Sequence, residues 1–353
     1  MATVNELKDG QTFEGTLWLV SSSVKRTKNG DPYWEGQLQD STGSISGKVW
    51  DSSGGKGGRV KALEPSLAAG SAVKIRARVE SFSGALQLNI LEAAPAPNAS
   101  PELFSPKSLR PLKEMVYELD AAIASLKDPD YKRLLSSFRE GQQLFGPFCN
   151  APAAKAVHHA WVHGLLEHSL QLARGAKALA PLYPGLDEEL VILGCFFHDA
   201  GKAWEISALP GFDYTTKGKL LGHIYMGARL VEELCGRMKD FPEEKKLHLT
   251  HLVLSHQGER SEGFGSAADP ATPEAIFFHH LDNLDAKVQN CFTAIEQAQE
   301  SGDEFTPPRY PMRKTYYRVR PQGETVNHAS AKPARDDSEK GSGPEEKSWP
   351  KLW

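Results

Sequence analysis

Six side chains between positions 168 and 282 could bind a metal ion, because each lies among apolar residues at helix-like spacing. They are His168, His198, Asp199, His223, His256 and Asp282. One histidine on an apolar helix face is usually a core residue with a hydrogen-bond partner, and a buried carboxylate without a partner costs free energy. Six such groups on five helical segments exceed what a bundle core can pair internally, whereas a divalent metal ion pairs with all of them. The pattern therefore predicts metal binding.

The ligand types narrow the choice of metal. Imidazole and carboxylate ligands without cysteine favour Mn, Fe, Co, Ni or Zn over calcium or magnesium alone. We expect one or two divalent ions, with Mn²⁺ as the first choice and Co, Fe, Ni or Zn as alternatives. The four cysteines lie at least 40 residues apart, which excludes a CxxC site and a disulfide framework and favours a reducing cytoplasm.

The elements that must position these side chains fall into domains. The 353 residues are 40% apolar and 24% charged, as in a soluble globular protein with two domains. Short runs with strand-like composition predict a five-stranded OB-fold barrel within residues 1–95, with a short helix near 60–67; the runs are 12–20, 33–38, 44–50, 72–79 and 85–91. Prolines mark a linker over 96–110. Helical periodicity then predicts an all-α bundle over 111–301, and polar composition predicts a disordered tail over 302–353.

Charge and hydropathy exclude some partners. The net charge of −4 excludes a polycation, so any nucleic-acid surface must be local. No stretch approaches the ~20 apolar residues of a membrane span, and the N-terminus carries no basic-then-apolar signal, so we expect no membrane partner and a cytoplasmic protein. The chain has no G-x-S-x-G elbow and no P-loop, which argues against acyl transfer and NTP-driven work.

The order of the six candidate ligands, with the dyad context FFHDAGK, resembles the HD-domain phosphohydrolase superfamily. Adding the OB-like domain and the segments VHHAWVHGLLEHSL, LLGHI and TPEAIFFHHLDNLDAKV, the chain is similar to the YhaM family of 3′→5′ exoribonucleases. The resemblance implies His168, His198, Asp199 and Asp282 as core metal ligands. It implies that His223 and His256 complete a second metal site that Asp199 bridges.

The resemblance also implies roles around the metal ligands. Asp199 and Lys202 would be the catalytic residues, with Lys202 facing the substrate phosphate. Many family members read Ser-His-His where this chain has Gln257 after His256, which leaves the effect on the second metal site open. Further imidazoles and a carboxylate are candidates for outer-shell or substrate contacts, namely His159, His280 and Asp285, and in addition His158 and His279.

The barrel would prefer a polymer over a free nucleotide, because OB-folds stack unpaired bases on exposed rings beside basic loops. The rings available are Trp18, Tyr33 and Trp34, and alternation along a strand turns only one of the last two outward. The predicted nucleic-acid contacts are Lys25, Arg26, Lys28 and Trp34. A basic segment of the tail, 308–321, interleaves Tyr310, Tyr316 and Tyr317, and is either a solvated tail or a nucleic-acid-binding arm.

Together these features predict a metal-dependent 3′-5′ exoribonuclease that hydrolyses phosphodiester bonds of single-stranded RNA through a metal-activated water. Single-stranded DNA remains open as a second substrate, and a homo-oligomer remains open as the assembly. One alternative is an HD-domain phosphohydrolase acting on nucleotides or cyclic nucleotides. The other is a non-catalytic nucleic-acid-binding protein with a structural metal.

Overall fold

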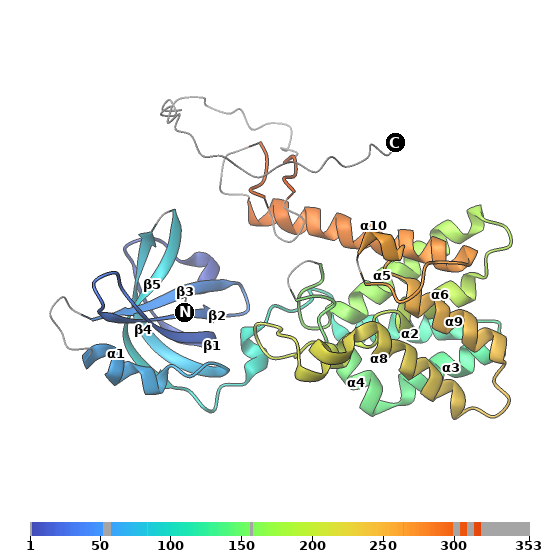
Figure 1. Cartoon of the computed structure of the whole chain (residues 1–353), viewed down its shortest axis with the longest axis horizontal. Coiled ribbons are helices and arrows are strands. Elements are labelled where there is room, and N and C mark those ends of the chain that lie inside the picture. Colours follow the sequence, from blue (N-terminus) through green and yellow to red (C-terminus); the bar gives the residue numbers. More distant parts are fainter. Residues whose placement is uncertain are drawn as a thin grey trace.

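The computed structural model describes residues 2–51, 58–82, 84–155, 158–263, 265–298, 304–308 and 314–318. Figure 1 shows an N-terminal β-barrel joined by a connection to a bundle of helices, with the long helix α10 running along one side of the bundle. This is the predicted fold class, an OB-like barrel followed by an all-α domain. None of the helices in the described part of the chain combines enough length and apolar character to span a membrane.

The barrel is a closed sheet with the strand order β1-β2-β3-β5-β4. Its strands are β1 (Thr12–Arg26), β2 (Pro32–Gln39), β3 (Ser44–Trp50), β4 (Ser71–Phe82) and β5 (Ala85–Pro95). The short 3-10 helix η1 (Val4–Glu6) precedes β1, and α1 (Gly58–Leu63) and η2 (Glu64–Ser66) lie between β3 and β4, as predicted. Strand β1 extends beyond the predicted 12–20 because its second half pairs with β2.

The connection between the domains is hydrogen bonded at both ends. The 3-10 helix η3 (Pro101–Phe104) ends at Phe104, whose carbonyl oxygen accepts a hydrogen bond from Gln39 Nε2 at 2.9 Å. The Phe104 ring lies 6.0 Å from the Trp18 ring. A few residues later, Val162 N donates to the Pro106 carbonyl at 2.8 Å, and Lys107 forms a parallel bridge with Val162. The predicted linker is therefore fixed to the barrel and to the loop that precedes α5.

The helical domain packs around one apolar core. Its helices are α2 (Leu112–Ser125), α3 (Pro129–Glu140), α4 (Gln142–Asn150), α5 (Gly164–Leu179), η4 (Ala180–Leu182), α6 (Glu188–Phe197), α7 (Lys202–Glu205), α8 (Thr216–Gly236), α9 (Glu243–Ser255), η5 (Arg260–Glu262) and α10 (Pro273–Gln297). Helix α6 is buried along its whole apolar run, and α5, α9 and α10 pack against it. This packing places the residue after the last turn of α6, where the His-Asp dyad lies, in the centre of the bundle.

Two short pieces of the predicted tail are paired with each other and with α10. Phe305 bridges Tyr317, and their rings lie 5.4 Å apart. Asn290 of α10 donates to the Tyr316 hydroxyl at 3.0 Å. Tyr310 and the remainder of the predicted tail and arm lie outside the described residues.

Candidate metal centre and nucleic-acid face

The first half of the candidate centre is built by the imidazoles of α5 and the dyad together with a carboxylate of α10. His168 Nε2 lies 3.3 Å from His198 Nε2 and 3.1 Å from Asp282 Oδ1. His198 Nε2 lies 3.8 Å from the same Asp282 oxygen. These three atoms are close enough to share one ion.

The second half is built around the dyad aspartate. Asp199 Oδ1 lies 3.4 Å from His223 Nε2 and 3.6 Å from His256 Nε2, which come from α8 and from the residue after α9. Its other oxygen, Oδ2, lies 3.2 Å from His198 Nε2. Asp199 therefore connects the two groups of ligands, which together contain all six residues singled out in the sequence.

Close backbone contact explains how His223 reaches the dyad. A Cβ built on Gly201 would lie 2.1 Å from the His223 carbonyl oxygen, so only glycine lets the start of α7 meet α8 this closely. Helix α8 is kinked at Gly222, whose φ of +71° favours glycine. The kink frees the backbone N–H of His223, which donates to Glu205 Oε1 at 3.0 Å. Both glycines thus serve to place one imidazole.

Each of the four imidazoles has an acceptor at Nδ1, so its Nε2 is the atom left for the centre. The Nδ1 contacts are His168 to Asp285 Oδ2 at 2.7 Å, His198 to the Gly194 carbonyl at 3.1 Å, His223 to Glu205 Oε1 at 3.1 Å and His256 to the Val253 carbonyl at 2.8 Å. A proton on Nδ1 satisfies these acceptors and leaves a lone pair on Nε2, which is the tautomer of a metal-binding histidine.

The electrostatics of the cluster favour a cation. Burial lowers the pKa of His168, but hydrogen bonds with Asp282 and Asp285 outweigh it and raise that pKa to about 9. Burial raises the pKa of Asp199, but the Lys202 ammonium and the His198 imidazole outweigh it and hold that pKa well below its usual range. The negative charge that favours a protonated imidazole here also favours a divalent metal ion.

The donor set fits such an ion. Asp199 Oδ1 is buried and accepts no hydrogen bond from any residue that the structure describes. Asp199 Oδ1 faces the Nε2 atoms of His223 and His256. Because the protons of these imidazoles are at Nδ1, the lone pairs of Nε2 point toward the lone pairs of the carboxylate oxygen. A buried acceptor among acceptors is costly, and a cation removes that cost. Nitrogen and oxygen ligands of this kind suit the transition metals predicted from the sequence.

Asp285 and His159 lie behind the first group of ligands. Asp285 Oδ2, which accepts from His168 Nδ1, also lies 3.2 Å from His159 Nε2, and both side chains are buried. His159 has a φ of +46°, so the loop before α5 holds it in the left-handed region. This carboxylate contacts an imidazole of the centre through Nδ1, and its outer-shell role stays a prediction.

Lys202 and His158 lie on another side of the cluster. Lys202 Nζ pairs with Asp199 Oδ2 at 2.6 Å, and the Lys202 side chain is 12% exposed. The His158 ring lies 5.3 Å from that of His168, and its Nδ1 is buried without a hydrogen-bond partner in the described part of the chain. Burial lowers the pKa of His158 to about 3, so this imidazole is neutral near pH 7. His279 is buried and its Nδ1 contacts the His256 carbonyl at 3.0 Å.

Sequence reasoning missed Glu205. It accepts both the backbone N–H and Nδ1 of His223, and the resulting hydrogen bonds outweigh burial and lower its pKa. The available signal was an acidic residue in the short segment after the dyad.

Gln257 stands where many family members have a second histidine. Its Nε2 lies 3.2 Å from His223 Nε2, so its amide donates to the lone pair that a second ion would need.

His280 is a correction. It is exposed on the outer side of α10, where it lines an apolar cavity of about 710 Å³ with Tyr183, Ile276 and Leu284. Two residues along a helix correspond to a rotation of about 200°, so a helix that turns Asp282 inward turns His280 away.

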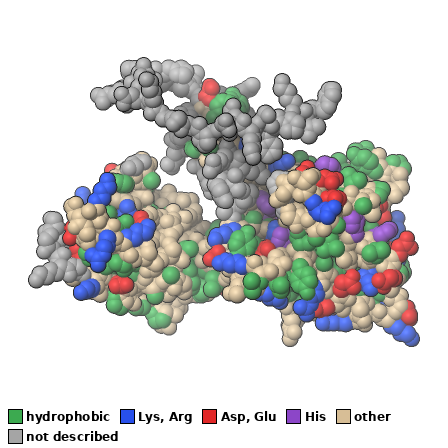
Figure 2. Space-filling model, viewed as in Figure 1, with side chains coloured by type: hydrophobic (Ala, Val, Ile, Leu, Met, Phe, Trp, Pro, Cys, Tyr) green, Lys and Arg blue, Asp and Glu red, His purple; other side chains and the backbone are tan. Residues whose placement is uncertain are grey.

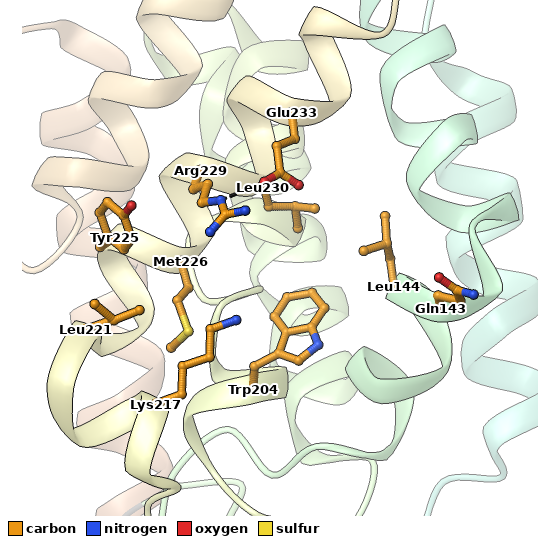
Figure 3. Close-up of a pocket in the computed structure, with 10 residues that line it drawn as sticks. All are labelled: Gln143, Leu144, Trp204, Lys217, Leu221, Tyr225, Met226, Arg229, Leu230 and Glu233. Atoms are coloured by element: carbon orange, nitrogen blue, oxygen red, sulfur yellow. Dashed lines mark hydrogen bonds and ion pairs between the residues drawn. The ribbon is translucent and has the colours of Figure 1, made fainter.

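A second cavity, of about 230 Å³, lies between α4, α7 and α8 and is lined by Trp204, Lys217 and Arg229 among others (Figure 3). Neither cavity contains a candidate ligand.

Trp34 is also a correction. Its side chain is fully buried in the barrel core, and its Nε1 donates to Ser22 Oγ at 2.8 Å. Alternation therefore turns Tyr33 outward, where its ring stacks on Trp50 with centroids 4.8 Å apart. Trp18 is buried against Phe104. The face of the barrel in Figure 2 carries several Lys and Arg side chains.

The three basic residues predicted to contact nucleic acid, Lys25, Arg26 and Lys28, differ in position and in their partners. Lys25 and Arg26 belong to the end of β1, and Lys28 lies in the exposed turn that follows. Lys25 Nζ pairs with Glu35 at 2.5 Å, and Arg26 donates to the Gly30 carbonyl at 2.8 Å. Within the described residues, Lys28 has no ion pair or side-chain hydrogen bond and is the most available cation of the three.

Comparison with known proteins agrees with this architecture. The HD domain family model matches residues 165–287, which contain all six candidate ligands. The 3′-5′ exoribonuclease YhaM of Bacillus subtilis is 32% identical over 295 residues, covering 82% of this chain and 90% of that protein. The YhaM enzyme of Bacillus velezensis is 34% identical over 288 residues, covering 80% of this chain and 87% of that protein. The chain belongs to the YhaM family of 3′-5′ exoribonucleases.

The similarity to the YhaM enzymes spans both domains, since a match over four-fifths of the chain cannot lie in the helical domain alone. Among solved structures, the second OB-fold domain of replication protein A from Methanococcus maripaludis aligns with 28% of this chain and 97% of that chain, at 15% identity and a TM-score of 0.22. The family assignment therefore rests on the YhaM sequences, and the barrel is described from its own strand order.

Proposed function

We propose that this chain removes nucleotides from the 3′ end of single-stranded RNA by metal-dependent hydrolysis of phosphodiester bonds. The observation that carries the proposal is the convergence of four imidazole Nε2 atoms on Asp199 and Asp282 inside an HD-type bundle that follows an OB-like barrel. The naming of the YhaM relatives as 3′-5′ exoribonucleases supports the direction and the substrate.

The residues that would hold metal ions are His168, His198 and Asp282 in one group and Asp199, His223 and His256 in the other. Bound divalent ions would supply Lewis acidity, which lowers the pKa of a coordinated water and offsets charge on the phosphate. Mn²⁺ is the first choice among the metals that suit these ligands. Asp199, with contacts in both groups, is the ligand that the proposal makes indispensable.

The chain's own groups orient and charge the centre. Asp285 and Glu205 hold two of the imidazoles by their Nδ1 atoms, so that Nε2 faces inward. The Lys202 ammonium, paired with Asp199 at 2.6 Å, is a fixed positive charge beside the ligands. In our proposal it contacts a non-bridging oxygen of the scissile phosphate and stabilises the charge that develops there.

The proposal is tested by incubating the protein and Mn²⁺ with single-stranded RNA labelled at the 5′ end. We expect a ladder of shortened labelled products, and release of a labelled mononucleotide when the label is at the 3′ end. Asp199→Ala should abolish the ladder and most metal binding, whereas Asp120→Ala, which changes an exposed aspartate of α2, should leave both intact. Turnover of dNTPs or a cyclic dinucleotide without RNA shortening would instead support the nucleotide phosphohydrolase and contradict the proposal.

A further inference from the structure

The outer face of the barrel carries an aromatic cluster that the hydrolytic centre does not use. Tyr33 of β2 and Trp50 of β3 are register partners, and their rings stack at an interplanar angle of 19°. Phe82, at the end of β4, is 63% exposed. Lys48 Nζ lies 5.4 Å from the Trp50 ring centroid and 5.3 Å from that of Phe82. We call these four residues the aromatic platform.

The barrel core does not need these rings. It is filled by inward residues of the same strands, among them Trp34 and Val49, both fully buried. Alternation turns Tyr33, Lys48 and Trp50 to the other face, where they are only partly buried. Grouped rings on a polar surface, with an exposed phenyl ring at their edge, are typical of a binding site.

The charge around the aromatic platform suits a polyanion. Glu35 lies next to Lys48, 3.8 Å from its Nζ, and also pairs with Lys25 at 2.5 Å. Two ammonium groups thus share one carboxylate, which leaves one net positive charge among these three side chains. The Lys25 side chain is 52% exposed, so it can contact a phosphate while a base lies on the rings.

We propose that the aromatic platform stacks unpaired nucleobases, with Lys25 and Lys48 beside the backbone phosphates. Aromatic rings bind the π-face of any base, and the bases of a duplex are already stacked on each other, so the ligand is single-stranded RNA or DNA. This inference deepens the proposed function, because a strand held here is the substrate whose 3′ end is hydrolysed. Binding at the platform requires no metal, so the two can fail separately.

The test measures binding of fluorescein-labelled 12-nucleotide RNA, DNA of the same sequence, and an RNA duplex to the full chain by fluorescence anisotropy in EDTA. We expect Phe82→Ser and Trp50→Leu each to weaken single-strand binding about 5- to 150-fold, the range for loss of one stacked base. Lys48→Gln should lower the slope of log K against log salt by about 0.7, as expected for one lost phosphate contact on a single strand.

The matched control is Tyr117→Ala, which removes from α2 of the helical domain a ring that is more exposed than Phe82, and it should change binding less than twofold. Loss on RNA alone or on both single strands supports the platform and tells which sugar it accepts. Equal loss on the duplex would overturn it, as would twofold or smaller effects of Phe82→Ser and Lys48→Gln in folded protein. Phe82 and Lys48 decide the outcome if Trp50→Leu unfolds the barrel.

Hydrolysis of the p-nitrophenyl ester of thymidine 5′-monophosphate with Mn²⁺ separates the two proposals. The platform variants should hydrolyse this small ester at the rate of the unchanged protein, because it is too short to reach the barrel. Single-strand binding without any hydrolysis of RNA would contradict the proposed function and leave the platform supported. Hydrolysis of RNA together with unaltered single-strand binding in the platform variants would support the proposed function and contradict the platform.

Discussion

Replacing Asp285 with alanine should weaken metal binding although Asp285 is not itself among the proposed ligands. In the structure its Oδ2 accepts from His168 Nδ1 at 2.7 Å and lies 3.2 Å from His159 Nε2. Hydrogen bonds with both histidines outweigh burial and lower the pKa of Asp285 well below its usual range, so it is a carboxylate near pH 7. Alanine removes the group that fixes the tautomer and the orientation of one ligand.

The magnitude follows from the role of such partners. Loss of a carboxylate behind a metal-binding histidine typically lowers metal affinity 10- to 100-fold, or about 1.4 to 2.7 kcal/mol. Two buried imidazole N–H groups also lose their acceptor, which costs about 1 to 3 kcal/mol each in the stability of the fold. Asp285→Asn keeps an acceptor oxygen of the same shape, so it should lose less affinity than alanine does.

The assay is a competition titration of Mn²⁺ against a chromophoric chelator, which needs no RNA and no turnover. Asp282→Ala, which removes a proposed ligand, should bind metal more weakly than Asp285→Ala, and exposed Asp120→Ala should match the unchanged protein. If Asp285→Ala binds Mn²⁺ within twofold of the unchanged protein, His168 does not depend on this carboxylate and the reasoning is refuted.

Three further predictions concern packing, the second ion and pH. Gly201→Ala should lower the melting temperature and weaken metal binding, because its Cβ would meet the His223 carbonyl; calorimetry with and without Mn²⁺ checks this. Gln257→Leu should strengthen binding of the weaker ion, since it removes the amide that donates to His223; titration calorimetry that resolves two binding events would show an unchanged second event if this is wrong. Asp128→Ala should lower the free energy of unfolding by about 1 kcal/mol at pH 7, because the Asp128 side chain caps α3 and pairs with Lys245. Burial raises the pKa of Asp128, but the hydrogen bonds from Lys245 and from the backbone outweigh burial and lower that pKa. The contribution of Asp128 to the stability of the fold is therefore complete above about pH 4 and is lost as pH falls through the lowered pKa. Urea unfolding of both proteins from pH 7 to pH 2 should show their difference shrinking only below about pH 4.

The ligand cluster was predictable because its members interrupt apolar helical patterns, and the 3.6-residue period places them on inward faces. Asp282 and Asp285, one turn apart, lie on the same inward side of α10, whereas the period turns His280 outward. Glu205 could not be found in this way. Its role depends on the kink at Gly222, which brings a distant backbone N–H to its carboxylate.

The barrel was predictable in its strand order along the chain but not in its outward residues. The alternation rule allowed either Tyr33 or Trp34 to face solvent, and the choice depended on pairing with β3. Trp34 pairs with Val49 and joins the core, while Tyr33 pairs with Trp50. The second half of β1 was missed because its side chains are exposed on both faces, so no apolar alternation marks it.

If the proposed platform holds the strand, the anchored connection between barrel and bundle would make digestion depend on the length of the substrate. Phe104 is held by β-strand residues, and Pro106 and Lys107 are held by the loop beside His163, so the freely linked stretch between the two domains is short. A strand long enough to reach both the platform and the metal centre would be bound at two sites, and a shorter strand would be bound at one. Digestion should therefore slow at one remnant length whatever the base sequence, and inserting residues into 96–103 should change that length.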